Sequence, residues 1–185
     1  MFLGTAHESR REYRAFGSAT WLFCLPAGTV AEGPLYFWSY VYYLSKYYEL
    51  LDTFILVWKA KPLSFLHVFH HSLVVIMAYL WLDQAQSLQQ IALLTNAGIH
   101  MGMYFYYFLT SLGFRPPWKQ LVTVGQIIQF VFSFAVSIPF WILQLRRGNC
   151  SGFKAMLFNS VFNFILLGLF IDFHRRSYKA KRKKA

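Results

Sequence analysis

Two short segments of the sequence place ionisable side chains inside otherwise apolar stretches. The segment KYYELLDT carries Lys46, Glu49 and Asp52, and the segment HVFHH (67–71) carries three histidines. A charged side chain at the centre of a bilayer costs at least about 2.5–3.5 kcal/mol on insertion scales, so several such groups together mark a site. A neutral imidazole can attack a thioester, and its protonated form can return the proton. The sequence therefore predicts histidine chemistry inside a membrane.

Polar residues of these and three further segments recur at helical spacing, so each set shares one face of an expected helix. His67, His70 and His71 stand at positions i, i+3 and i+4, and the three charged residues of KYYELLDT recur at every third position. The charged set either forms a structural salt-bridge ladder or takes part in the chemistry. Five polar stripes predict helices that turn toward a common interior. The other stripes are Asn96, His100, Met103, Tyr104 and Tyr107; Thr123, Gln126 and Gln129; and Asn159 and Asn163.

The HxxHH spacing also resembles the iron-binding boxes of membrane di-iron desaturases and hydroxylases, in which neutral imidazoles ligate the metal. Those sites need more histidines than the six of this chain, of which His7 and His174 lie outside the cluster. We therefore expect no metal, and a di-iron desaturase or hydroxylase is the less favoured alternative.

The composition is that of an integral membrane protein. Of the 185 residues, 57% are hydrophobic and only 14% are charged, whereas ordinary soluble domains have roughly 25% charged residues. The formal net charge of +11 is concentrated in the tail 175–185, beyond the last apolar segment. Because no aromatic and basic recognition module accompanies this charge, we expect membrane lipid and no nucleic acid as a partner. The expected fold is an all-α polytopic membrane protein.

Five apolar segments are long enough to cross a bilayer. Since basic residues favour the cytoplasmic side, we expect a cytoplasmic tail 175–185 and a lumenal N-terminal segment 1–33. Cys24 and Cys150 would then both face the lumen, where they either form a disulfide or stay free thiols. The expected spans are residues 34–58, 65–82, 88–112, 119–145 and 153–173.

Four sequence blocks together resemble the very-long-chain fatty acid elongases of the endoplasmic reticulum, the ELO family. Family members usually have seven spans, so the resemblance implies that this chain holds the last five, in a catalytic region 34–174. These spans would form most of a helical barrel around a buried acyl chamber. The chain would then be a fragment, a truncated product or a naturally short form. The blocks are KYYELLDT (46–53), HVFHH (67–71), NAGIHMGMYFYY (96–107) and TVGQIIQF (123–130).

The resemblance implies a condensing enzyme that joins long-chain acyl-CoA and malonyl-CoA to give 3-oxoacyl-CoA, CO₂ and CoA, without a cofactor. His70 would attack the acyl thioester to form an acyl-imidazole, and His100 would be its acid–base partner or activate the malonyl unit. His67 and His71 would orient these groups or bind the developing oxyanion. Further contacts would come from Asn96, Met103, Tyr104, Tyr107, Gln126 and Gln129, while Lys46, Glu49 and Asp52 would hold their helix or contact the CoA end.

The same resemblance implies a location and partners. Lys181 and Lys183 resemble the dilysine retrieval signal of endoplasmic reticulum membrane proteins. Partners would be the 3-ketoacyl reductase, dehydratase and enoyl reductase of the elongation cycle, with a homodimer as a further option. The alternative to an enzyme is a non-catalytic, truncated elongase-like membrane protein. Basic residues that suit CoA phosphates, and equally suit simple topology signalling, are Lys59, Lys61, Arg115 and Lys119.

Overall fold

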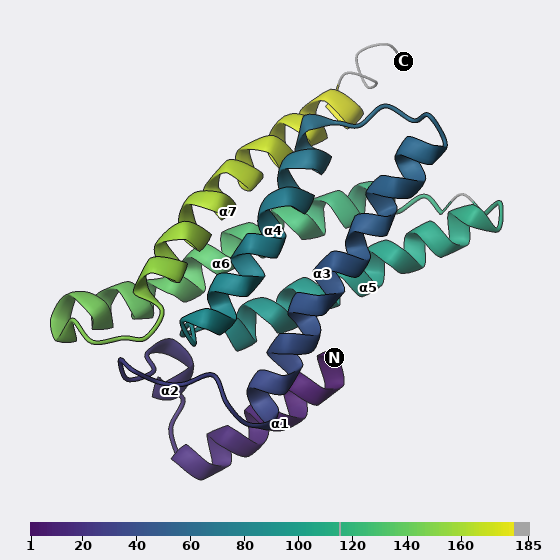
Figure 1. Ribbon diagram of the computed structural model, residues 1–185. Helices are drawn as coiled ribbons and strands as arrows, with labels where there is room; N and C mark the ends of the chain where they lie inside the picture. The colour runs from purple at the N-terminus through teal and green to yellow at the C-terminus, as the bar shows by residue number, and fades with distance from the viewer. Residues whose placement is uncertain (115, 180–185) are drawn as a thin grey trace.

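The computed structural model describes residues 1–114 and 116–179, and this part of the chain is mostly helical (Figure 1). Each of the five segments expected from the sequence forms a long helix whose ends lie within two residues of the predicted ones. Pro34 begins the first of them, because its fixed φ suits a first helical turn. The long helices are α3 (Pro34–Trp58), α4 (Phe65–Asp83), α5 (Gln89–Ser111), α6 (Lys119–Arg147) and α7 (Phe153–His174).

The chain is an all-α polytopic membrane protein. Within the described residues, three helical segments are long and apolar enough to cross a membrane, namely Phe65–Asp83, Lys119–Arg146 and Phe153–Tyr178. Large apolar side chains are widely exposed on the outer faces of the helices, as contact with lipid requires. Polar stripes lower the hydropathy of α3 and α5, so the count of five spans stays a prediction.

The long helices form a closed ring. α3 contacts α4, α4 contacts α7, α7 contacts α6, α6 contacts α5, and α5 returns to α3 (Figure 1). Two of these contacts, α4 with α7 and α5 with α3, join helices that are not consecutive in sequence, and they close the ring so that the polar faces of all five helices can meet inside it.

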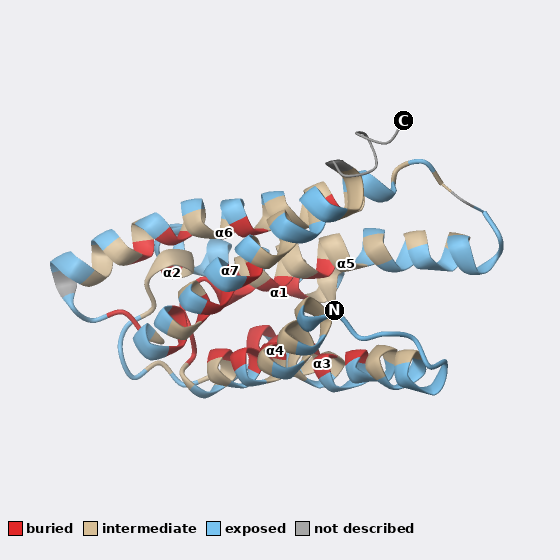
Figure 2. Ribbon diagram, turned by 90° about the horizontal axis from the view of Figure 1, so that it is seen from above, coloured by how far each residue is buried: buried red, intermediate tan, exposed pale blue. Residues whose placement is uncertain are grey.

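The apolar core lies inside this ring and draws on all five long helices. Tyr42 of α3 stacks on Trp81 of α4, with ring centroids 5.7 Å apart. Leu93, Phe130 and Phe162 bring α5, α6 and α7 into the same cluster. Between helices in lipid, close packing of this kind takes the place of the hydrophobic effect as the stabilising force. Figure 2 shows that the buried residues gather along the inner faces of the helices.

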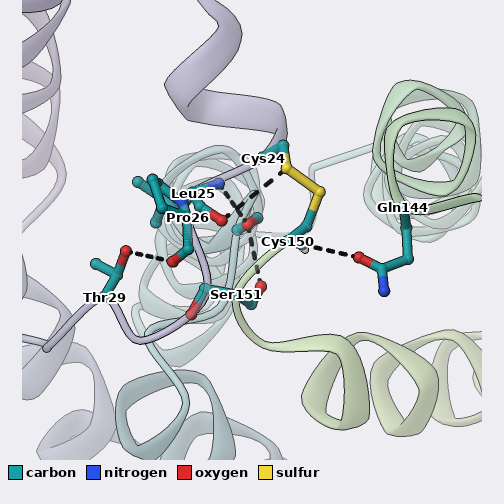
Figure 3. Close-up of a disulfide and its surroundings, with 8 residues drawn as sticks. Cys24, Leu25, Pro26, Thr29, Gln144, Cys150 and Ser151 are labelled. Carbon is teal, nitrogen blue, oxygen red and sulfur yellow. Dashed lines mark hydrogen bonds between the residues drawn. A yellow bond between two sulfur atoms is a disulfide. The ribbon is translucent and has the colours of Figure 1, made fainter. Parts of the chain in front are cut away.

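At one end of the ring, here called the disulfide end, the loops 24–29, 84–88 and 148–152 are joined. A disulfide links Cys24 to Cys150, the pairing that the sequence left open (Figure 3). The Leu25 N–H donates to the Ser87 hydroxyl at 3.0 Å, and the Ser151 N–H donates to the Leu25 carbonyl at 2.7 Å. One short helix, α2 (Thr20–Phe23), precedes the first loop. Three segments far apart in sequence therefore form one compact cap.

The sequence analysis missed a helix in the segment 1–33. α1 (Phe2–Phe16) is amphipathic and packs against α3 and α5. Its Thr5 and Glu8 are buried, and Gly4 lies so close to Trp38 that any side chain at position 4 would collide with the indole. Charged residues hid this helix from a search for apolar segments, although their spacing fits an amphipathic helix.

At the opposite end, here called the tail end, the chain continues from α7 into a short π-helix, Arg175–Lys179. The Tyr178 hydroxyl lies 3.3 Å from the Thr123 hydroxyl, and His174 lies 3.3 Å from Gln120, so this segment is held against the start of α6. Lys181 and Lys183, the predicted retrieval signal, lie outside the described residues.

The disulfide end depends on Gly152, which gives a test by substitution. Gly152 has φ +79°, and an added Cβ would collide with the backbone of Gln86. We expect Gly152→Ala to destabilise the protein by about 1–3 kcal/mol. Gly148→Ala, with φ +65° but open space around it, should cost less, and Gly168→Ala, with neither restriction, should cost least.

The measurement is the fraction of purified protein that remains monodisperse after heating in detergent. A Gly152→Ala protein as heat-resistant as Gly168→Ala would contradict the close approach of the two loops.

Candidate active site

A cavity of about 430 Å³ lies inside the ring toward the tail end. Its walls come from all five long helices, and the apolar side chains Phe130, Phe170 and Phe173 line one part of it. Most of the polar residues singled out from the sequence also line it. They are His67, His70, His71 and His100, together with Asp52, Asn96, Met103, Tyr104, Tyr107, Gln126 and Gln129.

The first turns of α4 present three histidines to this cavity. The Ser64 side chain caps the helix by accepting from the His67 backbone N–H at 3.2 Å, which fixes where the helix begins. The His67 Nε2 lies 2.8 Å from the Thr53 hydroxyl of α3. The rings of His67 and His71 are 4.2 Å apart, and those of His70 and His71 are 5.1 Å apart. The three imidazoles therefore form one contiguous cluster.

His70 faces a fourth histidine, His100 of α5. Their ring centroids are 6.5 Å apart, and the two side chains bring ligand-type nitrogens within 4.8 Å of each other. Phe162 of α7 stacks on His70 at 6.3 Å. A single carbonyl group between α4 and α5 could therefore contact both imidazoles, which is the arrangement that two-base acyl transfer needs.

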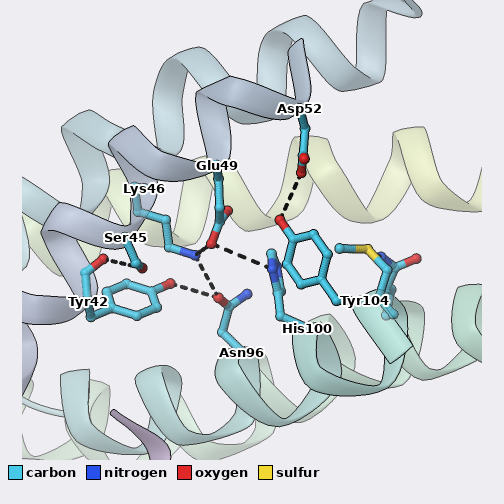
Figure 4. Close-up of polar contacts among 10 residues, drawn as sticks. Tyr42, Ser45, Lys46, Glu49, Asp52, Asn96, His100 and Tyr104 are labelled. Atoms are coloured by element: carbon cyan, nitrogen blue, oxygen red, sulfur yellow. Dashed lines mark hydrogen bonds and ion pairs between the residues drawn. The ribbon is translucent and has the colours of Figure 1, made fainter. Parts of the chain in front are cut away.

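Behind His100 lies a buried ion pair, Lys46 with Glu49 (Figure 4). The Lys46 ammonium donates to the Glu49 Oε1 at 2.7 Å and to the Asn96 Oδ1 at 3.1 Å, and it sits 4.3 Å from the Tyr42 ring centre. The Tyr42 hydroxyl donates to the same Asn96 oxygen at 2.9 Å. Lys46 is only 1% exposed. Because neither member of the pair lines the cavity, the pair supports α3 and α5 from behind the histidines.

Two polar contacts brace the wall formed by α3, α5 and α6. The Tyr104 hydroxyl donates to the Asp52 carboxylate at 2.8 Å (Figure 4). The Gln126 amide donates to the Met103 sulfur at 3.5 Å. Of the stripe Lys46, Glu49 and Asp52, only Asp52 lines the cavity.

Several buried polar atoms of the site have no hydrogen-bond partner among the described residues. They include the Nδ1 atoms of His70, His71 and His100 and the Oε2 atom of Glu49. An unsatisfied buried polar group costs about 1–3 kcal/mol, so such groups are uncommon without a functional reason. Three of these atoms belong to histidines that line the cavity, where a polar reacting group could supply the missing partner.

Glu49, His70 and His100 also form a set of three potential metal ligands. The Lys46 ammonium already lies 2.7 Å from the Glu49 oxygen, and two positive charges at such short range repel each other strongly in a buried site. The donor set is therefore poorly suited to a divalent cation as long as Lys46 is charged.

Three of the four basic residues predicted to bind CoA lie at the tail end but outside the cavity. Lys59 ends α3, Lys61 lies in the loop that follows, and Lys119 begins α6, and all three are exposed. Arg115 lies outside the described residues. Both loops are on the side of the ring where the cavity lies.

Toward the disulfide end the ring interior narrows to cavities of about 40 and 20 Å³. This part of the interior is partly polar, because Ser133 and Asn159 line both of these spaces and Asn163 lines one. The weak stripe of Asn159 and Asn163 was the only sign of this polarity in the sequence. The large side chains of Trp81 and Phe130 line the cavity of about 40 Å³ and narrow this part of the interior.

Comparison with known proteins places the chain among fatty acid elongases. Residues 1–185 match the family described as ELO, GNS1/SUR4 family. A putative fatty acid elongase of Dictyostelium discoideum is 36% identical over 98% of this chain and 62% of its own length. Fatty acid elongase sre1 of the same organism is 36% identical over 100% of this chain and 69% of its own length. A fatty acid elongase 3-like protein of Arabidopsis thaliana is 30% identical over 95% of this chain and 62% of its own length.

The chain therefore spans about 62–69% of the length of these relatives. No solved structure matches the chain significantly.

The buried ion pair behind the cavity can be tested by a double-mutant cycle. Lys46→Met leaves the Glu49 carboxylate buried without its partner, and we expect a loss of about 3–5 kcal/mol of stability. Lys46→Met with Glu49→Gln removes both charges and should recover most of the loss. The readout is the monodisperse fraction after heating in detergent. A double variant as unstable as the sum of the two single variants would contradict a direct ion pair.

Proposed function

Because the chain belongs to the ELO (GNS1/SUR4) family of fatty acid elongases, we propose that it catalyses the condensing step of fatty acid elongation. The substrates are long-chain acyl-CoA and malonyl-CoA, and the products are 3-oxoacyl-CoA, CO₂ and CoA. The observation that best supports this proposal is the approach of His70 and His100 to within 4.8 Å across an intramembrane cavity. Two imidazoles so placed provide a nucleophile and a proton donor for one acyl carbon.

In the first half-reaction a His70 nitrogen attacks the thioester carbonyl. A nitrogen–carbon bond forms, the carbon–sulfur bond breaks, and CoA leaves with the electron pair. His67 and His71, in the same cluster as His70, orient the nucleophile and stabilise the oxyanion. The other His70 nitrogen keeps its proton, so the product is a protonated acyl-imidazole, which the ring of helices shields from bulk water.

In the second half-reaction malonyl-CoA takes the place of CoA. The bond between its α-carbon and its carboxylate breaks, CO₂ leaves, and the electron pair attacks the acyl carbonyl. The new carbon–carbon bond forms as the nitrogen–carbon bond to His70 breaks, which regenerates the imidazole. No metal is needed, because the imidazoles supply both the nucleophile and the acid.

The tail end suits the CoA groups, which carry several phosphates. Lys59, Lys61 and Lys119 are exposed there, and we assign Arg115 the same role. Since CoA is cytosolic, the tail end would face the cytoplasm, and Cys24 and Cys150 would face an oxidising lumen. We therefore place the chain in the endoplasmic reticulum membrane, with the reductases and dehydratase of the elongation cycle as partners and Lys181 and Lys183 as the retrieval signal.

The proposal predicts that His70→Ala abolishes condensation. We expect incorporation of radiolabelled malonyl-CoA into acyl-CoA by microsomes to fall by at least about 10³-fold, as for loss of a catalytic nucleophile. His7→Ala is the matched control, because His7 is an exposed histidine of α1 that does not line the cavity, and it should leave the rate unchanged.

Two results would contradict the proposal. An acyl-enzyme that still forms in His70→Ala would exclude His70 as the nucleophile. Loss of wild-type activity on treatment with a strong iron chelator would instead support the di-iron alternative.

A further inference from the structure

The condensation consumes one proton. If the chain has the proposed function, the structure indicates which residues deliver that proton to the leaving group. Acyl-CoA and the malonyl-CoA carboxylate together lack the proton that the released CoA thiol carries. The sulfur departs with the electron pair of the carbon–sulfur bond, so a proton donor beside it lowers the barrier. His100 is the imidazole that faces the nucleophile from another helix, with ring centroids 6.5 Å apart.

The two nitrogens of His100 have different surroundings. Nδ1 is buried and has no hydrogen-bond partner among the described residues, and it lies 3.6 Å from the Glu49 Oε1. The ring lines the cavity, so Nε2 is the nitrogen that remains for a substrate. Glu49 therefore faces the side of the ring that does not react.

The surroundings of Glu49 hold its carboxylate in a fixed position. Lys46 donates to its Oε1 at 2.7 Å, and Asn96 and Tyr42 hold the ammonium in place. Glu49 is only 8% exposed, and its second oxygen is unpartnered within the described residues. Nδ1 of His100 and the Lys46 ammonium both face the Glu49 Oε1, at 3.6 and 2.7 Å, so Glu49 is the carboxylate that Nδ1 faces. The other ionisable groups around the ring are Asp52, His67, His70, His71, Tyr104 and Tyr107.

We propose that Glu49 is a positioning residue that holds a proton on Nδ1 of His100 and so makes Nε2 the acid for the CoA sulfur. In the protonated ring, Nδ1–H points to Glu49 and Nε2–H points to the leaving group. As the bond from His70 to the acyl carbon forms, the Nε2 proton passes to the sulfur. The neutral ring keeps its Nδ1 proton and takes up the one proton that each turnover consumes from the solvent at Nε2. A small shift from 3.6 Å to about 2.7–2.9 Å would complete the charge-assisted bond to Glu49.

The test compares two leaving groups in the first half-reaction, without malonyl-CoA. The substrates are an acyl-CoA and the acyl thioester of a nitrothiophenol, whose weakly basic thiolate leaves without a proton. We expect Glu49→Gln to slow release of radiolabelled CoA by about 10²-fold, the usual contribution of a positioned acid. Release of the nitrothiophenol should change by less than about threefold.

Two further proteins accompany this test. Lys46→Met with Glu49→Gln carries no unpaired buried charge, so it provides the same comparison if Glu49→Gln alone does not fold. Glu8→Gln is the matched control, because Glu8 is a buried carboxylate of α1 that pairs with Arg11 at 3.2 Å and does not line the cavity. This control should release both thiols as fast as the wild type.

The outcomes separate this inference from the proposed function. Equal losses with both thioesters would make Glu49 purely structural, and an unchanged rate of CoA release would also overturn its role. A wild-type protein that releases neither thiol would overturn acyl transfer to His70, and the assignment of Glu49 with it.

Discussion

The ion pair between Lys46 and Glu49 is the interaction on which the site depends. In a membrane interior neither charge could be left alone, because the loss of one partner exposes the full desolvation cost of the other. Asn96 extends the pair from α3 to α5 at 3.1 Å, and the same α5 carries His100 one turn further on. The pair therefore sets both the distance between two helices and the position of an imidazole.

The two ends of the ring are built on different principles. At the disulfide end, backbone hydrogen bonds and the link from Cys24 to Cys150 join three loops into a rigid cap. At the tail end the histidines and the large cavity lie near the first turns of α4. The helices are thus joined by a cap at one end, and the cavity with its histidines lies toward the other end.

Much of this architecture could be predicted from the sequence, because the relevant signals are local. The length of the apolar segments and the Pro and Gly residues between them located the five long helices. The spacing of His67, His70 and His71 placed these three histidines on one helix face. The ring order of the helices follows from packing between segments distant in sequence, which no periodicity shows. The sequence analysis missed α1, because a segment with so many charged residues resembles a loop.

The sequence predicted which residues belong to the candidate site, but not which of them reach the cavity. A helical stripe indicates which residues share a face, but the rotation of α3 decides which of them reach the cavity. Asp52 does reach it, whereas Lys46 and Glu49 lie one row behind. Likewise, Asn159 and Asn163 gave a weak pattern, and only the packing of α6 against α7 shows that they line a narrow polar passage. Which side chains point into the cavity depends on how all five helices pack together.

The link from Cys24 to Cys150 joins positions 126 residues apart. Both loops at the tail end, 59–64 and 112–118, fall between these two cysteines in the sequence. A single backbone cut in either loop would therefore release no fragment, since the two pieces would remain one covalent molecule. Either loop at the tail end could therefore be severed while the helices stay tethered as a single covalent unit.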